Sequence, residues 1–174
     1  MIAQLITYRQ TSKITLLIER YSDVTLARNL ARKIHAGQQR RSNKNPYFTH
    51  VLRVSKHAAQ LGYKPEIQIA AALHDAIEDG ANPKQIEKEI NQKFGQKVLE
   101  IIKALTHNKQ KSNYTQYLLS LAKKSSDAFK VKMIDMYDNL TDHPTSKQKK
   151  KYSTAISELL AKNIEVPQQI LNVI

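Results

Sequence analysis

The chain has 174 residues, which suits one compact domain that can bury a sizeable core without disulfides or a structural metal. Because it contains no cysteine, a disulfide framework and thiolate metal sites are excluded, and any metal must be held by nitrogen and oxygen ligands. The formal net charge of +13 favours a polyanionic partner, such as a phosphorylated nucleotide, a nucleic acid or an anionic surface, without choosing among them.

Helix signals recur from the N-terminus onward, and strand signals do not. A first helix is expected within residues 1–22. Asp23 is expected to cap a second helix, whose apolar residues repeat at helical spacing as far as Ile34. Gly37 then supplies the left-handed residue that ends this helix.

Three further helices are expected to begin with a proline at the first helical position, where its missing N–H is not needed: Pro46, Pro65 and Pro83. An asparagine precedes the first and the third of these prolines and is expected to act as the N-cap. The helical pattern that starts at the second proline is expected to end before Gly80.

Four more helical patterns follow before Pro167, over residues 96–105, 113–124, 127–140 and 146–162. No repeat of domain-building length occurs, and no linker rich in Gly, Pro or Ser separates two domains. The sequence therefore predicts an all-α fold, a single-domain helical bundle over residues 1–174. The helices within 1–22 and 146–174 are expected to pack on its core.

Four polar residues on three of these helices stand among aliphatic neighbours, so their side chains should point inward: His50, His74, Asp75 and Asp135. A buried, ionised carboxylate is costly unless a cation or hydrogen-bond donors compensate it. Two imidazoles and two carboxylates form a mixed site that suits Mn, Fe, Co, Ni or Zn, whereas Mg and Ca prefer all-oxygen ligation. We therefore predict that the four side chains converge on one metal ion, with a helix bend letting the adjacent His-Asp pair reach it together.

Two further carboxylates are expected beside that site, because residues four apart share one helix face. Glu78 and Asp79 each lie one turn beyond one of the two adjacent ligands. Such a pair suits general acid and base catalysis on a water that the cation activates, although alone it would be an ordinary charged helix end. By the same rule Asn139 lies one turn after Asp135, where its amide could orient that ligand or touch a substrate.

Other histidines are given plainer roles. His57 lacks inward acidic company and is interpreted as a structural or surface residue. His35 ends a helix, where a cation complements the helix dipole. Both this helix-end role and a role in the metal site are left open for His35. The lysine-rich segment 147–151 is interpreted as the solvated start of a C-terminal helix.

The ordered pattern H, HD and D of the four candidate ligands resembles the HD phosphohydrolase superfamily. The surrounding segments HAGQQRR, NPYFTHVLRV, AAALHDAIEDG, FGQKVLEIIKALTH and VKMIDMYDNL are similar to the hydrolase domain of RelA/SpoT-type enzymes and of the stand-alone small alarmone hydrolases. The similarity spans about residues 24–143, and the remaining length is not expected to hold a synthetase or regulatory domain.

The resemblance implies a helical bundle of the HD-domain type with one Mn2+ bound by His50, His74, Asp75 and Asp135. It implies that Glu78 and Asp79 are the catalytic carboxylates. The implied reaction belongs to the bacterial stringent response: hydrolysis of guanosine 3′-diphosphate 5′-(di)phosphate at the 3′ ester, which releases pyrophosphate and GDP or GTP.

Substrate contacts are implied for one basic cluster and one amide: Arg40, Arg41, Lys44 and Asn139. The loop RSNKNP is one residue longer than the usual form in the family, which leaves the choice between the two arginines open. Met136 and Thr141 stand where the family commonly has a basic residue and an arginine. These two departures lie outside the ligand set and bear on base and ribose recognition.

Two alternatives remain beside this reading. One is another nucleotide phosphatase on the same scaffold, acting on the 2′-phosphate of NADPH or on (p)ppApp. The other is a basic nucleic-acid-binding protein with a degenerate site, although no recognised nucleic-acid motif with interleaved aromatics is found. Since no signal-peptide pattern or membrane-length apolar run occurs, we expect a cytoplasmic protein. Its expected partner is a small nucleotide substrate rather than nucleic acid or membrane. Homo-oligomerisation is left open.

Overall fold

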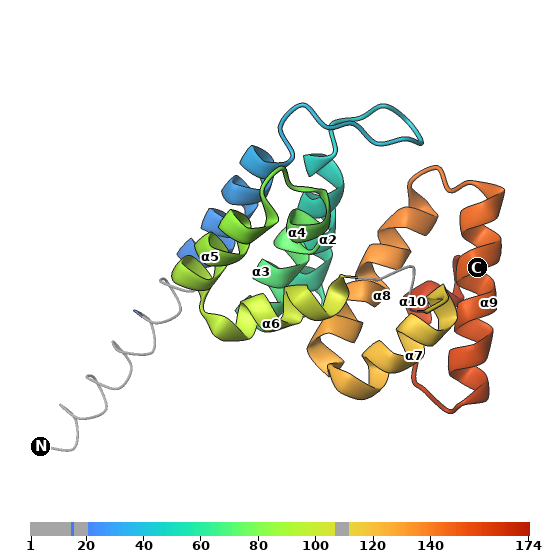
Figure 1. The fold of residues 1–174 in the computed structure, drawn as a ribbon. Coiled ribbons are helices and arrows are strands. Elements are labelled where there is room, and N and C mark those ends of the chain that lie inside the picture. The colour runs from blue at the N-terminus through green and yellow to red at the C-terminus, as the bar shows by residue number, and fades with distance from the viewer. Residues whose placement is uncertain (1–14, 16–20, 107–111) are drawn as a thin grey trace, which may run out of the picture.

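The structure is a computed structural model that describes residues 15, 21–106 and 112–174 (Figure 1). Within these residues the regular structure is helical, apart from one isolated antiparallel bridge between Gln39 and Pro46. The predicted all-α fold is therefore confirmed. The helix expected within residues 1–22 lies almost wholly outside the described residues. Among the described residues, no helix is both long and apolar enough to cross a bilayer.

The first described helix covers residues 21–34. The helices that follow it in the chain are α2 (Phe48–Gln60), α3 (Pro65–Leu73), α4 (Ala76–Asp79), α5 (Pro83–Phe94), α6 (Gln96–Leu105), α7 (Tyr114–Lys124), α8 (Ser126–Thr141), α9 (Ser146–Ala161) and α10 (Gln168–Leu171).

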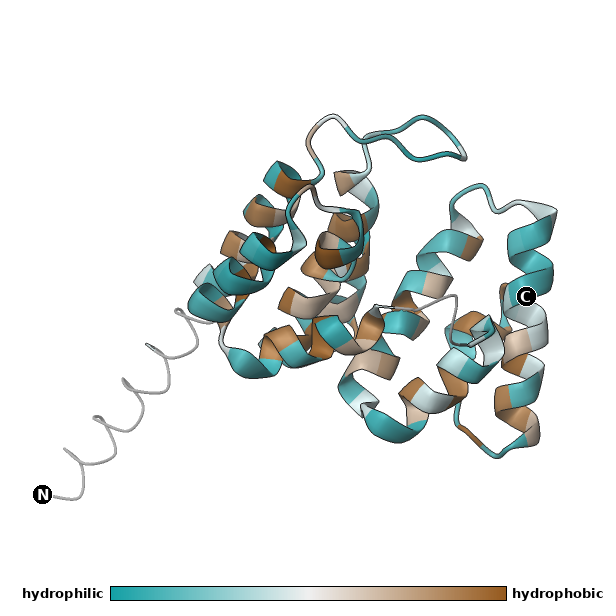
Figure 2. Ribbon diagram, viewed as in Figure 1, coloured by the Kyte–Doolittle hydropathy of each residue, from teal (hydrophilic) through white to brown (hydrophobic). Residues whose placement is uncertain are grey.

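Helix α8 joins two groups of helices (Figure 1). On one side it packs against α2, α3 and α6, and on the other against α7, α9 and α10. The contacts are apolar: Ile102, Leu118 and Leu159 are fully buried, and burying one such side chain contributes roughly 1.5–3 kcal/mol. The loop between the 21–34 helix and α2 is hydrophilic over most of its length (Figure 2). Helix α8 is thus shared by both groups, and polar residues on its inward faces are held in the interior of the bundle.

Local capping chemistry explains several helix starts. Asn82 accepts a hydrogen bond from the backbone N–H of Gln85 and is followed by Pro83, so the predicted start of α5 is confirmed. Two capping boxes, Asn113 with Gln116 and Thr145 with Gln148, open α7 and α9.

The predicted start of α2 is wrong by two residues. The helix begins at Phe48, because the chain before it pairs with a neighbouring segment instead of coiling. Arg40 N–H donates to the carbonyl of Asn45 at 2.8 Å, and Tyr47 N–H donates to the carbonyl of Gln38 at 2.9 Å. These two bonds keep Pro46 in an extended bridge, so Asn45 does not cap the helix.

The predicted cap at Asp23 is also wrong. Residues 21–34 form one uninterrupted helix, so Asp23 lies inside it. The helical pattern expected from Pro65 is interrupted at His74 and Asp75, which lie in a turn between α3 and α4, where the sequence predicted a bend.

Candidate metal centre

The break between α3 and α4 allows two adjacent residues to face one point. In an uninterrupted helix their side chains would diverge by about 100°. Here Nε2 of His74 lies 2.9 Å from Oδ2 of Asp75. The residues before the break, Ala70 to Leu73, are fully buried, so His74 is carried into the interior at the end of an apolar helix.

Three of the four predicted ligands form a tight buried group. His50 on α2, His74 after α3 and Asp135 on α8 each offer one ligand atom, and these atoms lie within 4.8 Å of one another. Oδ1 of Asp135 is 3.2 Å from Nε2 of His50 and 3.6 Å from Nε2 of His74. Each residue exposes 4% of its surface or less. Three separate helical segments therefore deliver nitrogen and oxygen donors to one point.

Asp75, the fourth predicted ligand, lies beside this group in a partly exposed position. Its Oδ2 lies 3.8 Å from Nε2 of His50, besides its contact with His74. The hydroxyl of Tyr47 donates to the same oxygen at 2.7 Å. Tyr47 was not predicted from the sequence, since a contact between a loop and a helix break has no periodic signal.

The hydrogen bonds of both imidazoles favour metal binding through Nε2. Nδ1 of His74 lies 2.9 Å from the carbonyl of Ala71, which can only accept, so Nδ1 must carry the proton. The buried Nε2 of His74 finds no hydrogen-bond partner with adequate geometry among the described residues. Nδ1 of His50 is likewise engaged, 2.7 Å from Oδ2 of Asp138. With both outer nitrogens occupied, the two inner lone pairs are available to a cation.

Asp135 is held by a lysine and an amide. Lys132 Nζ donates to Oδ2 at 2.7 Å, and Nδ2 of Asn139 donates to Oδ1 at 2.6 Å. Lys132 was missed in the sequence, although its position three residues before Asp135 is a spacing at which helix side chains meet. Asn139 lies where its helix spacing placed it, against the ligand.

The acids and bases of this group compensate one another electrostatically. Burial would raise the pKa of Asp135, but Lys132 and the two histidines lower that pKa well below its usual range. Burial would lower the pKa of His74, but Asp75 and Asp135 raise it well above its usual value. A group that attracts protons onto its imidazoles is also one in which a divalent cation can take the place of those protons.

A cavity of about 790 Å³ adjoins the metal-ligand group. Tyr47 and Asn139, which contact two of the candidate ligands, both line it. Its remaining lining residues are Gln38, Gln39, Arg40, Arg41, Ser42, Asp79, Thr145 and Gln148. Thr145 and Gln148, from the start of α9, were not predicted as site residues because neither belongs to a motif that the sequence analysis identified.

The predicted basic residues lie differently around this cavity. Arg40 is 7% exposed and donates to Oδ1 of Asn139 at 2.9 Å. Arg41 lines the cavity from an exposed position. Lys44 is exposed at a positive φ of 62° on the same loop and is not among the lining residues.

Glu78 and Asp79 are exposed residues of α4. Asp79 lines the cavity, and burial together with the charges of Asp75 and Glu78 raises its pKa above the usual value. Glu78 is not among the lining residues.

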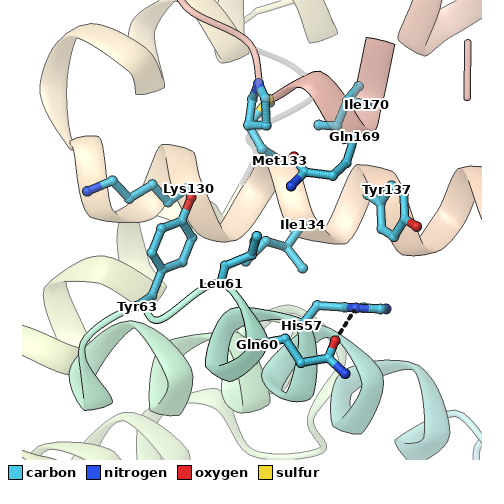
Figure 3. A pocket seen from close by; sticks show the side chains of 11 residues that line it. His57, Gln60, Leu61, Tyr63, Lys130, Met133, Ile134, Tyr137, Gln169 and Ile170 are labelled. Atoms are coloured by element: carbon cyan, nitrogen blue, oxygen red, sulfur yellow. Dashed lines mark hydrogen bonds between the residues drawn. The ribbon is translucent and has the colours of Figure 1, made fainter. Parts of the chain in front are cut away.

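A second cavity, of about 280 Å³, lies between the end of α2, the outer face of α8 and the C-terminal segment (Figure 3). His57 borders it, edge-on to Tyr137 with ring centroids 5.4 Å apart. None of its described lining residues is acidic, so it offers no mixed ligand set. The structural reading of His57 agrees with this position.

Known proteins resemble the chain over most of its length. The family described as HD domain matches residues 27–155. A guanosine-3′,5′-bis(diphosphate) 3′-pyrophosphohydrolase of Aquifex aeolicus is 30% identical over 125 residues, which cover 68% of this chain and 17% of that protein. A protein of the same name from Haemophilus influenzae is 41% identical over 73 residues, which cover 42% of this chain and 10% of that protein. The chain thus spans only a small part of the length of these relatives.

A solved structure agrees on the fold. It belongs to a protein described as a metazoan ortholog of SpoT that hydrolyzes ppGpp and plays a role in starvation responses. The TM-score is 0.70 at 22% identity, over 87% of this chain and 91% of that one. With the family match over residues 27–155 and these relatives, the chain belongs to the HD-domain family, and its resemblance to the RelA/SpoT-type hydrolase is confirmed.

Proposed function

We propose that the chain is a metal-dependent hydrolase of (p)ppGpp, which removes the 3′-diphosphate to give GDP or GTP and pyrophosphate. The observation that carries this proposal is the buried group of His50, His74 and Asp135 beside an arginine-lined cavity. The cavity volume of about 790 Å³ is within the range of small-molecule sites. The names of the Aquifex and Haemophilus relatives support the choice of substrate.

The proposed metal is Mn2+, held by His50, His74, Asp75 and Asp135. Two imidazole nitrogens and two carboxylate oxygens suit this ion, and the orphaned Nε2 of His74 supports a cation at this point. When bound, the ion would lower the pKa of water and neutralise phosphate charge.

The remaining residues act on substrate and protons. In the proposed reaction the guanidinium of Arg40, with Arg41 and Lys44 on the same loop, binds the substrate phosphates, because planar forks of N–H donors match phosphate oxygens. Asn139 links Arg40 to the ligand Asp135. Asp79 and Glu78 are the proposed proton carriers. The pKa of Asp79 is raised toward neutral pH, and a general acid or base is more effective when its pKa is near the working pH.

The test is a comparison of substrates on the purified protein with Mn2+. We expect ppGpp to yield GDP and pyrophosphate in equal amounts, measured by anion-exchange chromatography. Release of phosphate from NADPH alone, or turnover of (p)ppApp alone, would replace the proposed substrate by one of the alternatives. Absence of any turnover, with nucleic-acid binding that weakens steeply as salt rises, would replace the enzyme by a binding protein. The cytoplasmic location, the oligomeric state and the single domain over residues 1–174 stay predictions.

A further inference from the structure

Arg53 of α2 contacts two acids, one on α8 and one that directly follows it. Its Nε is 2.7 Å from Oδ1 of Asp138, and one terminal nitrogen is 2.9 Å from Oδ2 of the same carboxylate. That terminal nitrogen also lies 2.6 Å from Oδ2 of Asp142. Asp138 lies near the end of α8, and Asp142 is the C-cap residue that directly follows that helix.

The first of these acids acts on the metal-ligand group. Oδ2 of Asp138 lies 2.7 Å from Nδ1 of His50, and the side chain of Asp138 is 2% exposed. A carboxylate at this distance holds the proton on Nδ1 and fixes the ring plane, so that Nε2 points to the centre. Arg53 contacts both oxygens of this carboxylate, so it holds the position from which Asp138 acts on His50.

The second acid acts on the cavity. Oδ2 of Asp142 lies 3.3 Å from Nε of Arg40, and its Oδ1 accepts a hydrogen bond from Nδ2 of Asn43 at 2.9 Å. Asp142 thus holds both the side chain of Arg40 and the loop that carries Arg41. Since Arg53 contacts the same carboxylate, it fixes the position from which Asp142 acts.

We propose that Arg53 is a positioning residue that holds a metal ligand through Asp138 and a phosphate-binding arginine through Asp142. The role of Arg53 in phosphate binding rests on the proposed function. Its role in metal binding rests only on the geometry around His50. A guanidinium suits this place, because its planar fork can contact two carboxylates at once, which a lysine ammonium on a flexible stem does less well.

Three substitutions should give three different signatures. Asp138→Asn should weaken Mn2+ binding about tenfold or more, the usual effect of losing such a partner, and leave KM for ppGpp within about twofold. Asp142→Asn should raise KM and leave Mn2+ affinity within about twofold, because its carboxylate contacts Arg40 and not a ligand. Arg53→Ala should show both effects.

A matched control removes an ion pair elsewhere. Lys103→Ala loses the 2.9 Å contact between Lys103 on α6 and Glu87 on α5, which lies outside the metal group and the cavity. It should change neither Mn2+ affinity nor KM. Arg53 is 36% exposed, so its replacement should be tolerated, and Arg53→Lys serves as a second variant with an intermediate effect on Mn2+ affinity.

The experiment is calorimetric titration of Mn2+ into each metal-free variant, followed by steady-state hydrolysis of ppGpp and thermal melting. A loss of Mn2+ affinity in Asp138→Asn and Arg53→Ala, without such a loss in Lys103→Ala, supports the inference. Equal Mn2+ affinity in wild type, Asp138→Asn and Arg53→Ala overturns it, as does a fall in melting temperature alone. Because the titration needs no turnover, a wild type that binds Mn2+ but does not hydrolyse ppGpp refutes the proposed function separately.

Discussion

At the residue scale, the chemistry depends on which nitrogen of each imidazole is occupied. The carbonyl of Ala71 and the carboxylate of Asp138 take the outer nitrogens of His74 and His50. The inner nitrogens, Nε2 of both rings, face Asp135 and Asp75, as the binding of a cation between them would require. This arrangement separates residues that hold the metal from residues that move protons, and the two groups should respond differently to substitution.

Glu78→Gln should keep the metal and lose most of the rate. The amide preserves the size of the side chain but cannot carry a proton between substrate and water, and such groups supply about a hundredfold or more. Single-turnover hydrolysis of ppGpp and the Mn2+ content of the same sample measure both properties. Full activity in this variant would remove Glu78 from the proposed chemistry, and loss of Mn2+ would assign it to the metal instead.

Asp79→Asn should stabilise the metal-free protein near neutral pH. Burial and neighbouring acids raise the folded-state pKa of Asp79, so its charged form is disfavoured in the folded protein. This cost is present above the raised pKa and disappears as the pH falls through it toward the unfolded value. Calorimetric melting should therefore show a higher transition temperature for the variant at about pH 7, with the difference shrinking as the pH is lowered. Asp23→Asn on the 21–34 helix is the control, and a variant that melts below wild type at neutral pH would contradict the assignment.

At the element scale, the start of α5 was predictable because its signal is local. Asn82 and Pro83 start α5 as predicted, because a cap and a fixed φ act within one turn. The start of α2 was wrong because Asn45 and Tyr47 pair with the backbone of Arg40 and Gln38 outside the helix, a pairing that helix signals do not reveal.

The candidate ligands were predictable from their apolar surroundings, which indicate inward faces. The contacts of Arg53 with Asp138 and Asp142 were not, since helical spacing fixes which residues share a face but not how two helices are rotated against each other. Lys132 was within reach of the sequence, because its contact with Asp135 is local to α8.

Gly80 sets how closely α4 and α5 approach, and Gly80→Ala should destabilise the fold. An added Cβ would collide with the carbonyl of Ala76 and with Cδ1 of Ile86. Crowding a packed contact in this way costs typically about 1–3 kcal/mol. Urea unfolding measures the loss.

The Ile86→Val background provides a control, because valine lacks the Cδ atom that Gly80→Ala would meet. The cost of Gly80→Ala should therefore be smaller there than in wild type. An equal cost in both backgrounds would show that the side chain of Ile86 is not what limits the approach.

At the scale of the whole molecule, the net charge of +13 should speed the capture of an anionic nucleotide. Screening shortens the reach of these charges to about 10 Å at 0.1 M salt. We expect kcat/KM for ppGpp to fall as sodium chloride rises from about 0.05 M to about 0.5 M, while kcat changes little. Stopped-flow or steady-state kinetics across this series measures the effect. A kcat that falls in parallel would indicate that salt disrupts the site rather than substrate capture.

The central claim is that three segments of one helical bundle hold a single divalent ion with His50, His74, Asp75 and Asp135. Calorimetric titration of Mn2+ into the metal-free protein and into His74→Ala tests it most directly. We expect one equivalent of Mn2+ bound per chain in wild type and no measurable binding in His74→Ala. A wild type without binding, or a variant that still takes up one equivalent with unchanged affinity, would contradict it.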